Sequence, residues 1–205
     1  MMPSDTLLLE TIRIENGEIC NLPYHQARSD RSRKVLFGTT DTLSLSSVIQ
    51  PPSDGLYRCR ILYGREVHSV EYTPYLPKKI QRLQIISSDI SYDHKYADRS
   101  GLEALLQQCR DSDDILIEKE GYLTDTSIAN IAFYNGKQWL TPETPLLHGT
   151  MRQSLIDSGF LQTAKIKKEE IESYSHVALM NAMIGFKILK GIDLALARPS
   201  NVRLA

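Results

Sequence analysis

The chain has 205 residues, and its 24 lysines and arginines are balanced by 25 aspartates and glutamates, for a formal net charge of −1 at pH 7. Hydrophobic residues make up 41% and charged residues 24%, as in ordinary globular domains. A balanced charge argues against nucleic acids and anionic membranes as partners, because both are bound through an excess of Lys and Arg. No apolar run approaches the roughly 20 residues that a membrane-spanning helix needs.

The N-terminal stretch lacks the basic flank of a secretory signal, so we expect a cytoplasmic protein. Its three cysteines, Cys20, Cys59 and Cys109, are odd in number and widely spaced, which favours reduced thiols over a disulfide framework. The five histidines do not pair at the spacing of metal ligands. No metal site is therefore predicted.

Hydrophobic alternation and turn residues predict a first lobe of mixed helix and strand. Asn16 and Gly17 suit the positive φ angles of a two-residue hairpin loop, and Gly38 suits the end of a helix. Two prolines make Thr73–Lys79 the predicted linker. The elements predicted before it are a strand pair over Thr6–Leu22, a helix over Tyr24–Phe37, and strands over Leu56–Leu62 and Glu66–Tyr72.

The remainder of the chain predicts a second lobe with shorter elements, because its apolar runs are brief and separated by turn residues. The predicted elements are a strand over Ile80–Ile90, a helix over Gly101–Arg110, strands at Ile115–Ile117, Tyr122–Leu123, Ala129–Tyr134 and Trp139–Leu140, a helix over Met151–Ser158, and strands at Val177–Met180 and Phe186–Leu189. The expected fold class is α+β, in two small α/β lobes formed by residues 1–77 and 78–205.

Lys95 follows the strand predicted to end near residue 90, within the run Asp93–Tyr96. A lysine just beyond a strand is usually solvated. The functional alternative places it in a cleft, where burial or a second cation lowers its pKa enough for the neutral amine to form a Schiff base.

Two further runs carry polar residues at turns. In Glu120–Ile131, Asp125 and Asn130 either make ordinary turn hydrogen bonds or belong to a functional site. Gly149 and Thr150 open a predicted helix, whose free backbone N–H groups form an anion site suited to phosphate. The alternative there is a plain N-cap, with the Thr150 side chain bonded to the first turn.

Taken together and in order, these features resemble the fold-type IV (class IV) pyridoxal-phosphate enzymes, which include branched-chain and D-amino-acid aminotransferases and 4-amino-4-deoxychorismate lyase. The resemblance extends through nearly the whole chain. The residues that carry it are Leu9–Arg13, His25–Arg28, His94–Lys95, Gly121–Asp125, Ala129–Ile131, Gly149–Gln153 and Asn181–Gly185.

This resemblance implies pyridoxal 5'-phosphate as cofactor, held as a Schiff base by Lys95, which also serves as the catalytic base. Arg28 matches an arginine that grips the cofactor phosphate, a role suited to a forked, permanently charged group. Asp125 stands where the family usually has Glu, the partner that keeps the pyridine nitrogen protonated. Asn130, in the same motif, is a further implied cofactor-binding residue.

The phosphate cup is implied to have two more parts. Thr150 and Met151 match the backbone amides at a helix start, in agreement with the anion-site interpretation. Asn181 and Ala182 match a second turn on the phosphate side. The resemblance also implies a homodimer with its active site near the subunit interface.

Among activities of the family, the compact chain favours 4-amino-4-deoxychorismate lyase, which eliminates pyruvate to give 4-aminobenzoate for folate biosynthesis. A transaminase needs a fixed clamp for substrate carboxylates, and Arg60 and Arg65 are only candidate anchors. The alternatives are a small aminotransferase of the branched-chain or D-amino-acid type and a non-catalytic protein that binds pyridoxal phosphate without turnover. In each case the expected ligand besides the cofactor is a small amine or amino acid.

Overall fold

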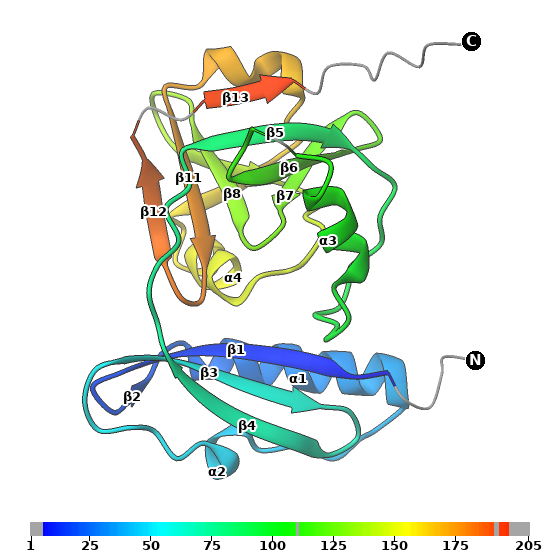
Figure 1. Ribbon diagram of the computed structural model, residues 1–205, viewed down its shortest axis with the longest axis vertical. Coiled ribbons are helices and arrows are strands. Elements are labelled where there is room, and N and C mark those ends of the chain that lie inside the picture. Colours follow the sequence, from blue (N-terminus) through cyan, green and yellow to red (C-terminus); the bar gives the residue numbers. More distant parts are fainter. Residues whose placement is uncertain (1–5, 110, 191–192, 197–205) are drawn as a thin grey trace.

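The computed structural model describes residues 6–109, 111–190 and 193–196. Figure 1 shows two β-sheets, one above the other, with the helices packed around them. The first sheet is antiparallel, in the order β2-β1-β3-β4. Its strands are β1 (Leu8–Glu15), β2 (Glu18–Ile19), β3 (Leu56–Tyr63) and β4 (Val67–Pro74).

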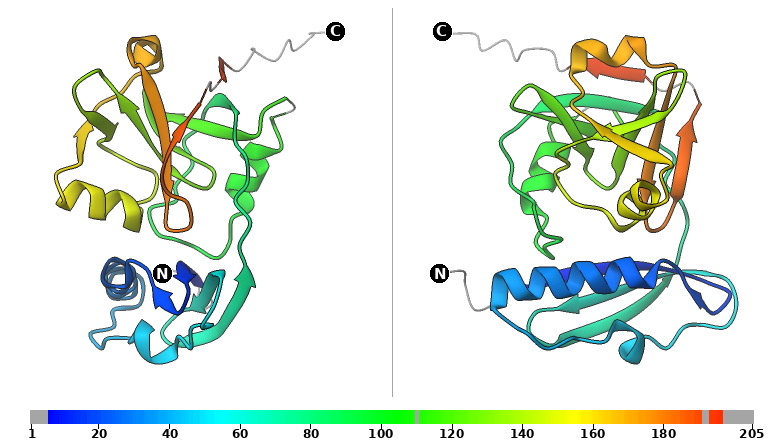
Figure 2. Two further views of the ribbon diagram at one scale, coloured as in Figure 1. Left: turned by 90° about the vertical axis from the view of Figure 1, so that its left-hand side faces the viewer. Right: turned by 180° about the vertical axis from the view of Figure 1, so that it is seen from behind.

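Helix α1 (Leu22–Phe37) lies along one face of this sheet, as the view from behind shows (Figure 2). Alternate residues of β1 and β3 point to that face because side chains alternate along a strand. With Leu45 of the short helix α2 (Leu45–Val48), they form a core of Leu8, Ile12, Ile14, Leu45, Ile49, Cys59, Ile61 and Tyr63.

The inner face of α1 is unusual because it is polar. Its buried residues are His25, Arg28, Ser29, Ser32 and Arg33, which share one side of the helix at the i, i+3, i+4, i+7, i+8 spacing. A helix normally covers a sheet with apolar side chains, so a buried polar stripe requires polar partners. The partners of His25 and Arg28 belong to the candidate site described below, whereas Arg33 donates to Asp41 and to the Arg65 carbonyl, away from that site.

The second sheet is mixed, in the order β10-β9-β8-β7-β6-β5-β13, with β11 pairing with β8 and β12. Three neighbouring pairs are parallel, namely β5 with β6, β5 with β13, and β9 with β10. The strands are β5 (Arg82–Ser87), β6 (Asp114–Lys119), β7 (Tyr122–Thr126), β8 (Asn130–Tyr134), β9 (Trp139–Pro142), β10 (Leu161–Ala164), β11 (His176–Asn181), β12 (Gly185–Leu189) and β13 (Asp193–Leu196).

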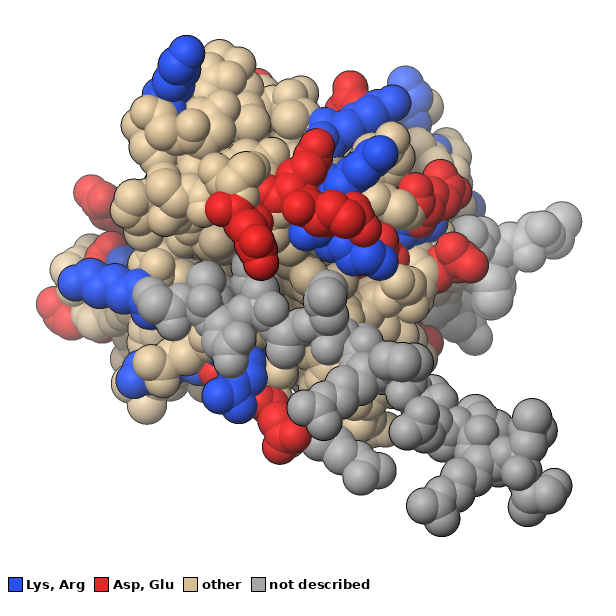
Figure 3. Space-filling model, turned by 90° about the horizontal axis from the view of Figure 1, so that it is seen from above, with Lys and Arg blue, Asp and Glu red and all other residues tan. Residues whose placement is uncertain are grey.

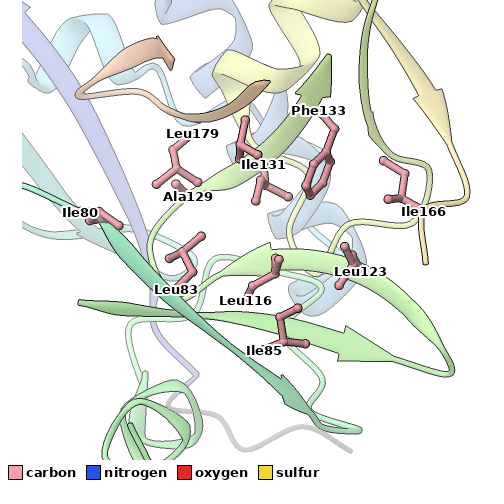
Figure 4. Close-up of a cluster of buried hydrophobic side chains, with 11 residues drawn as sticks. Ile80, Leu83, Ile85, Leu116, Leu123, Ala129, Ile131, Phe133, Ile166 and Leu179 are labelled. Carbon is pink, nitrogen blue, oxygen red and sulfur yellow. The ribbon is translucent and has the colours of Figure 1, made fainter. Parts of the chain in front are cut away.

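A cluster of apolar side chains fills the inside of this second sheet (Figure 4). Leu83 and Leu116 come from β5 and β6, while Ile131, Phe133 and Leu179 come from β8 and β11. Helix α3 (Ser100–Leu106), helix α4 (Thr150–Asp157) and the 3₁₀ helix η1 (Lys168–Ser173) complete this part of the chain.

Most of the predicted elements are confirmed. The strand pair around Asn16 and Gly17 forms as β1 and β2, both turn residues have positive φ, and Gly38 ends α1 at φ 66°. The two sheets lie on either side of the predicted linker, although β4 continues into it as far as Pro74. The lobe boundary at residues 77 and 78 stays a prediction.

Other predictions were wrong in extent or missed an element. The strand predicted over Ile80–Ile90 is the shorter β5, because the ladder with β6 ends at Ser87. Helix α3 ends at Leu106, and Arg110, the predicted end, lies outside the described residues. No prediction covered α2, β10, η1 or β13, which have short or weakly patterned sequences.

The surface at the end of the second sheet remote from the first carries acidic and basic side chains side by side (Figure 3). Within the described residues, no helix combines the length and apolar character needed to cross a bilayer. The same residues contain no cluster of three or more His, Cys, Asp or Glu arranged to hold a metal ion. The three cysteines are free thiols.

Candidate active site

A cavity of about 450 Å³ lies between the two sheets. Its wall combines β1, α1 and β3 of the first part of the chain with the segment 92–103, the β7–β8 turn, the start of α4 and the β11–β12 turn. Seven of the eight predicted site residues line it, namely Arg28, Lys95, Asp125, Asn130, Thr150, Asn181 and Ala182. The structure thus brings together residues that span 155 positions of the sequence, from 28 to 182.

Lys95 is fixed against the outer edge of β1. The Leu9 amide donates a hydrogen bond of 2.8 Å to the Lys95 carbonyl, and the Ala97 amide donates one of 2.8 Å to the Leu7 carbonyl. The segment therefore runs beside β1 as a short additional bridge, centred on Leu8 and Tyr96. This backbone pairing places the lysine at the border between the two sheets.

The Lys95 side chain is partly accessible through the cavity, and within the described residues no acceptor takes a hydrogen bond from its Nζ. Burial of the amine and the nearby charges of Arg28, Arg99 and Arg60 lower its pKa to about 7, although Glu10 opposes this shift. A substantial part of the amine is therefore neutral near pH 7, as a nucleophile or base requires. The solvated-lysine alternative is wrong here.

Arg28 is held by a fully buried carboxylate. Its Nε and Nη2 donate to the two oxygens of Glu10 at 2.8 and 2.5 Å, and His25 Nδ1 lies 2.6 Å from Glu10 Oε2. Burial by itself raises the pKa of Glu10, but the charge and hydrogen bonds of Arg28, with those of His25, bring it down to about 2. Glu10 thus stays ionised and orients the guanidinium in the cavity wall.

The start of α4 faces the same cavity. Gly149 is the N-cap and makes no side-chain capping bond, and the first intrahelical bond runs from the Gln153 amide to the Gly149 carbonyl at 2.9 Å. The N–H groups of Thr150, Met151 and Arg152 thus precede the helical ladder, as in helix termini that bind anions. The alternative of Thr150 as N-cap is wrong, because its hydroxyl lies 3.3 Å from His25 Nε2 instead.

Met151 is the one predicted site residue outside the cavity wall. Its side chain packs against a small apolar cluster that includes Ala132, Leu161 and Met180. The prediction concerned its backbone amide, which lies in the first turn of α4, so the side chain itself has a packing role.

Gly149 makes a close approach that leaves no room for a larger residue. A Cβ atom there would lie 2.0 Å from Asn130 Oδ1, and Asn130 is itself fixed by bonds to the Asp125 carboxylate (2.7 Å) and the Leu147 carbonyl (2.9 Å).

We therefore expect Gly149→Ala to lower the free energy of unfolding by about 1 to 3 kcal/mol, the cost of overpacking. By displacing the α4 terminus it should also weaken binding of the pyridoxal phosphate that the sequence resemblance implies. Chemical denaturation and cofactor titration measure the two effects. Gly159→Ala is the comparison, since a Cβ at Gly159 meets nothing within 4 Å and tests only the strain of its φ of 76°. Equal cofactor affinity in Gly149→Ala and wild type would contradict a role for the start of α4 in binding the phosphate.

Asp125 lies almost fully buried at the cavity wall. Asn130, its direct partner across the β7–β8 pair, donates to Oδ1, and the Leu147 amide donates to Oδ2 at 2.8 Å. Burial raises the pKa of Asp125 to about 6, although the bonds from Leu147 and Asn130 and the charge of Arg152 act against this rise. The two residues therefore make hydrogen bonds at the turn, as one alternative predicted, and both also line the cavity.

The β11–β12 turn supplies the last part of the wall. Asn181 Oδ1 accepts bonds from the amides of Met183 and Ile184 at 2.9 and 3.0 Å, which holds Ala182 at the cavity. Arg13 donates a 2.7 Å bond to the Met183 carbonyl and ties this turn to β1.

Sequence reasoning gave no role to Glu10, Arg58 or Arg99, all of which belong to this site or its support. Glu10 had a signal, since it occupies a core-facing position of β1 between Leu8 and Ile12, where a carboxylate needs a buried partner. The cavity position of Arg58 and Arg99 had no comparable local signal.

The sequence matches the family model "Amino-transferase class IV" over residues 7–191. A protein of Haemophilus influenzae is 41% identical over 184 residues, 87% of this chain and 98% of that one. A "Putative aminodeoxychorismate lyase" of Schizosaccharomyces pombe is 31% identical over 91 residues, which are 42% of this chain and 38% of that protein.

Among solved structures, a "putative 4-amino-4-deoxychorismate lyase" from Haemophilus somnus 129pt is 32% identical, with a TM-score of 0.79 over 88% of this chain and 98% of that one. The PLP-bound form of a "hypothetical aminotransferase" from Mycobacterium tuberculosis, 14% identical, has a TM-score of 0.74 over 95% of this chain and 85% of its own, a likeness of fold alone. These likenesses confirm the predicted fold. The chain belongs to the class IV aminotransferase family.

Proposed function

We propose that this protein is a pyridoxal-phosphate-dependent 4-amino-4-deoxychorismate lyase. The observation that carries the proposal is the cavity, where one unpaired lysine, an arginine beside a helix start, and a buried carboxylate surround a single space. The choice of lyase is supported by the 32% identity, over nearly the whole of its length, to a structure described as a putative lyase of this kind.

The residues present fit this cofactor at its phosphate, its carbonyl carbon and its pyridine nitrogen. Arg28 and the free amides at the start of α4 would hold the phosphate. Lys95, whose Nζ has no hydrogen-bond acceptor in the described part of the chain, would hold the carbonyl carbon. Asp125 would face the pyridine nitrogen, and its two donors, the Asn130 amide and the Leu147 N–H, fix the position of its carboxylate.

When bound, the cofactor supplies a protonated ring that accepts the electron pair of a breaking bond beside the substrate amine. The Asp125 carboxylate would keep the ring nitrogen protonated. The hydrogen bonds from Asn130 and Leu147 hold this carboxylate in a fixed position. Lys95, with a pKa of about 7, takes a proton from the carbon that bears the amine.

The net reaction is an elimination that balances without an oxidant. The C–H bond at the amine-bearing carbon breaks and its electron pair forms the new ring double bond, while the neighbouring C–O bond breaks. The enolpyruvyl group leaves with the C–O electron pair and takes up a proton to become pyruvate. The ring is then aromatic and is released as 4-aminobenzoate.

Asp125→Asn is expected to leave the cofactor bound but to slow turnover by about a hundredfold or more, the range of a positioned acid–base group. The amide preserves shape but removes the negative charge that keeps the ring nitrogen protonated. Steady-state kinetics at saturating cofactor measure the effect, with Asp157→Asn on the exposed end of α4 as the control. An unchanged kcat would place the nitrogen partner elsewhere.

The test of the function is incubation of the cofactor-loaded protein with 4-amino-4-deoxychorismate, with pyruvate and 4-aminobenzoate measured separately. Equal amounts of both products support the proposal. Amino-group transfer from a branched-chain or D-amino acid to an oxo acid, without pyruvate release, would establish the aminotransferase alternative. Bound cofactor with neither reaction would indicate the non-catalytic one.

A homodimer remains part of the proposal, through the family resemblance. Light scattering of the purified protein tests it. A mass equal to one chain would overturn it.

A further inference from the structure

Among the described residues, four arginines line the cavity, and they differ in what their side chains already bind. Arg28 is paired with Glu10, and Arg99 donates a 2.8 Å bond to the Ser127 carbonyl. Arg58 and Arg60, within the described part of the chain, have neither an ion pair nor a side-chain hydrogen bond. These two charges are therefore available to a ligand.

Their position on β3 places both on the cavity side of the first sheet. They are two residues apart, so they share a face, while Cys59 and Ile61 beside them point into the core under α1. β3 runs beside β1 (Figure 1). Arg60 is paired with Thr11 of β1, which is itself a cavity residue. The charge of Arg60 reaches the reacting end of the site, since it contributes to the lowered pKa of Lys95.

No carboxylate of the described chain neutralises this pair. Glu71 lies opposite Arg60 on β4, and Glu103 and Asp125 line the cavity, yet none of the three is within 4.0 Å of a basic nitrogen of Arg58 or Arg60. Two like charges on one face of a strand repel each other, and a bound anion relieves that repulsion. Guanidinium groups are well suited to carboxylates because they offer paired donors.

We infer that Arg58 and Arg60 form a carboxylate-binding subsite that selects amine substrates carrying a carboxylate remote from the reacting nitrogen. The inference rests on the proposed function and adds its specificity residues. It also separates the two candidate anchors of the sequence. Arg65 is outside the cavity wall, with its guanidinium 5.8 Å from the centre of the Phe37 ring, whereas Arg60 lies in the wall.

The test uses two probes that differ only in one carboxylate, 4-aminobenzoate and aniline, titrated into the cofactor-loaded protein while cofactor absorbance is followed. We expect 4-aminobenzoate to bind more tightly than aniline at low ionic strength. Arg58→Gln and Arg60→Gln should each reduce this preference by about twofold to fivefold, the range for an exposed charged contact, without weakening aniline binding. Added salt should reduce the preference in the wild type.

Arg65→Gln is the matched control and should keep the full preference. Equal affinity for both probes in the wild type, no binding of 4-aminobenzoate, or a preference that survives the Arg58→Gln/Arg60→Gln double substitution would overturn the subsite. Failure of the proposed function would be detected by a different measurement, the release of pyruvate. It would appear as absent pyruvate release with 4-amino-4-deoxychorismate, whatever the ratio of the two probe affinities.

Discussion

Lys95→Ala is expected to abolish covalent attachment of the cofactor and to lower turnover by about 10² to 10⁴-fold or more, the range of a lost proton-transfer group. The reason is that, among the described residues, Lys95 is the one lysine lining the cavity, and burial with nearby arginines lowers its pKa to about 7. Borohydride reduction followed by peptide mapping identifies the attachment site, and the product assay measures turnover.

The control for this variant is Lys137→Ala, at an exposed lysine in the β8–β9 turn. It should retain both attachment and turnover. Lys95→Ala should unfold at a denaturant concentration no lower than wild type, because the removed amine is largely desolvated and has no hydrogen-bond acceptor among the described residues. Full turnover in folded Lys95→Ala would remove this residue from the mechanism.

The pH dependence of attachment has a definite sign. The neutral amine reacts, so the rate at which cofactor-free protein takes up pyridoxal phosphate should rise as pH increases and level off above about 7. An exposed lysine keeps a pKa near 10.4 and continues to gain reactivity well beyond that point. A midpoint near 10 for Lys95 would show that its amine is hydrated like a surface group.

Glu10→Gln is expected to lower the free energy of unfolding of the cofactor-free protein by about 3 to 5 kcal/mol, the cost of removing one partner of a buried ion pair. The amide keeps the size of the side chain but leaves Arg28 buried without its counter-charge, and His25 loses its carboxylate partner. Chemical denaturation without cofactor is the measurement, because a bound phosphate beside Arg28 would replace part of the missing charge.

The comparison variant is Glu15→Gln on the same strand. Glu15 also pairs with an arginine, Arg13, at 2.8 Å, but its side chain is 48% exposed. An exposed pair contributes about 1 kcal/mol or less, so this change should be small. Similar losses of unfolding free energy in Glu10→Gln and Glu15→Gln would show that burial does not increase the contribution of the ion pair.

The difference between wild type and Glu10→Gln should also depend on pH. The pKa of Glu10 is about 2 in the folded protein against an ordinary 4.5. A carboxylate with a depressed pKa stabilises the fold fully above its unfolded value and loses that contribution as pH falls through the folded value. The two proteins should therefore become more alike in stability between about pH 4.5 and pH 2.

Local elements of this fold were predictable wherever backbone conformation restricts the residue type. The Asn16–Gly17 loop and the helix ends at Gly38 and Gly159 all need positive φ at a glycine or asparagine, and the sequence has one there. β10 was missed because Leu161–Ala164 has no strand pattern of its own, and it becomes a strand by pairing in parallel with β9. Such pairing is a non-local interaction.

The residues of the candidate site were likewise predictable only in part. The order of motifs predicted Arg28, Lys95, Asp125 and Thr150, and all four line the cavity. The sequence did not predict that Glu10 holds Arg28, because that bond joins β1 to α1 across 18 positions. It could not choose between Arg60 and Arg65 either, since both are arginines near one hairpin.

The sequence by itself therefore determined the family and the α+β class, and it supplied the proposed cofactor and the residues proposed to bind it, because all of these depend on residue type and order along the chain. Only the tertiary structure decided which charges are already neutralised. The Glu10 carboxylate neutralises Arg28, and the Ser127 carbonyl accepts a bond from Arg99 without neutralising its charge. Arg58 and Arg60 face the cavity with no side-chain partner in the described part of the chain. The physical reason is that pairing and burial are set by the packing of one sheet against the other, which brings together residues far apart in sequence.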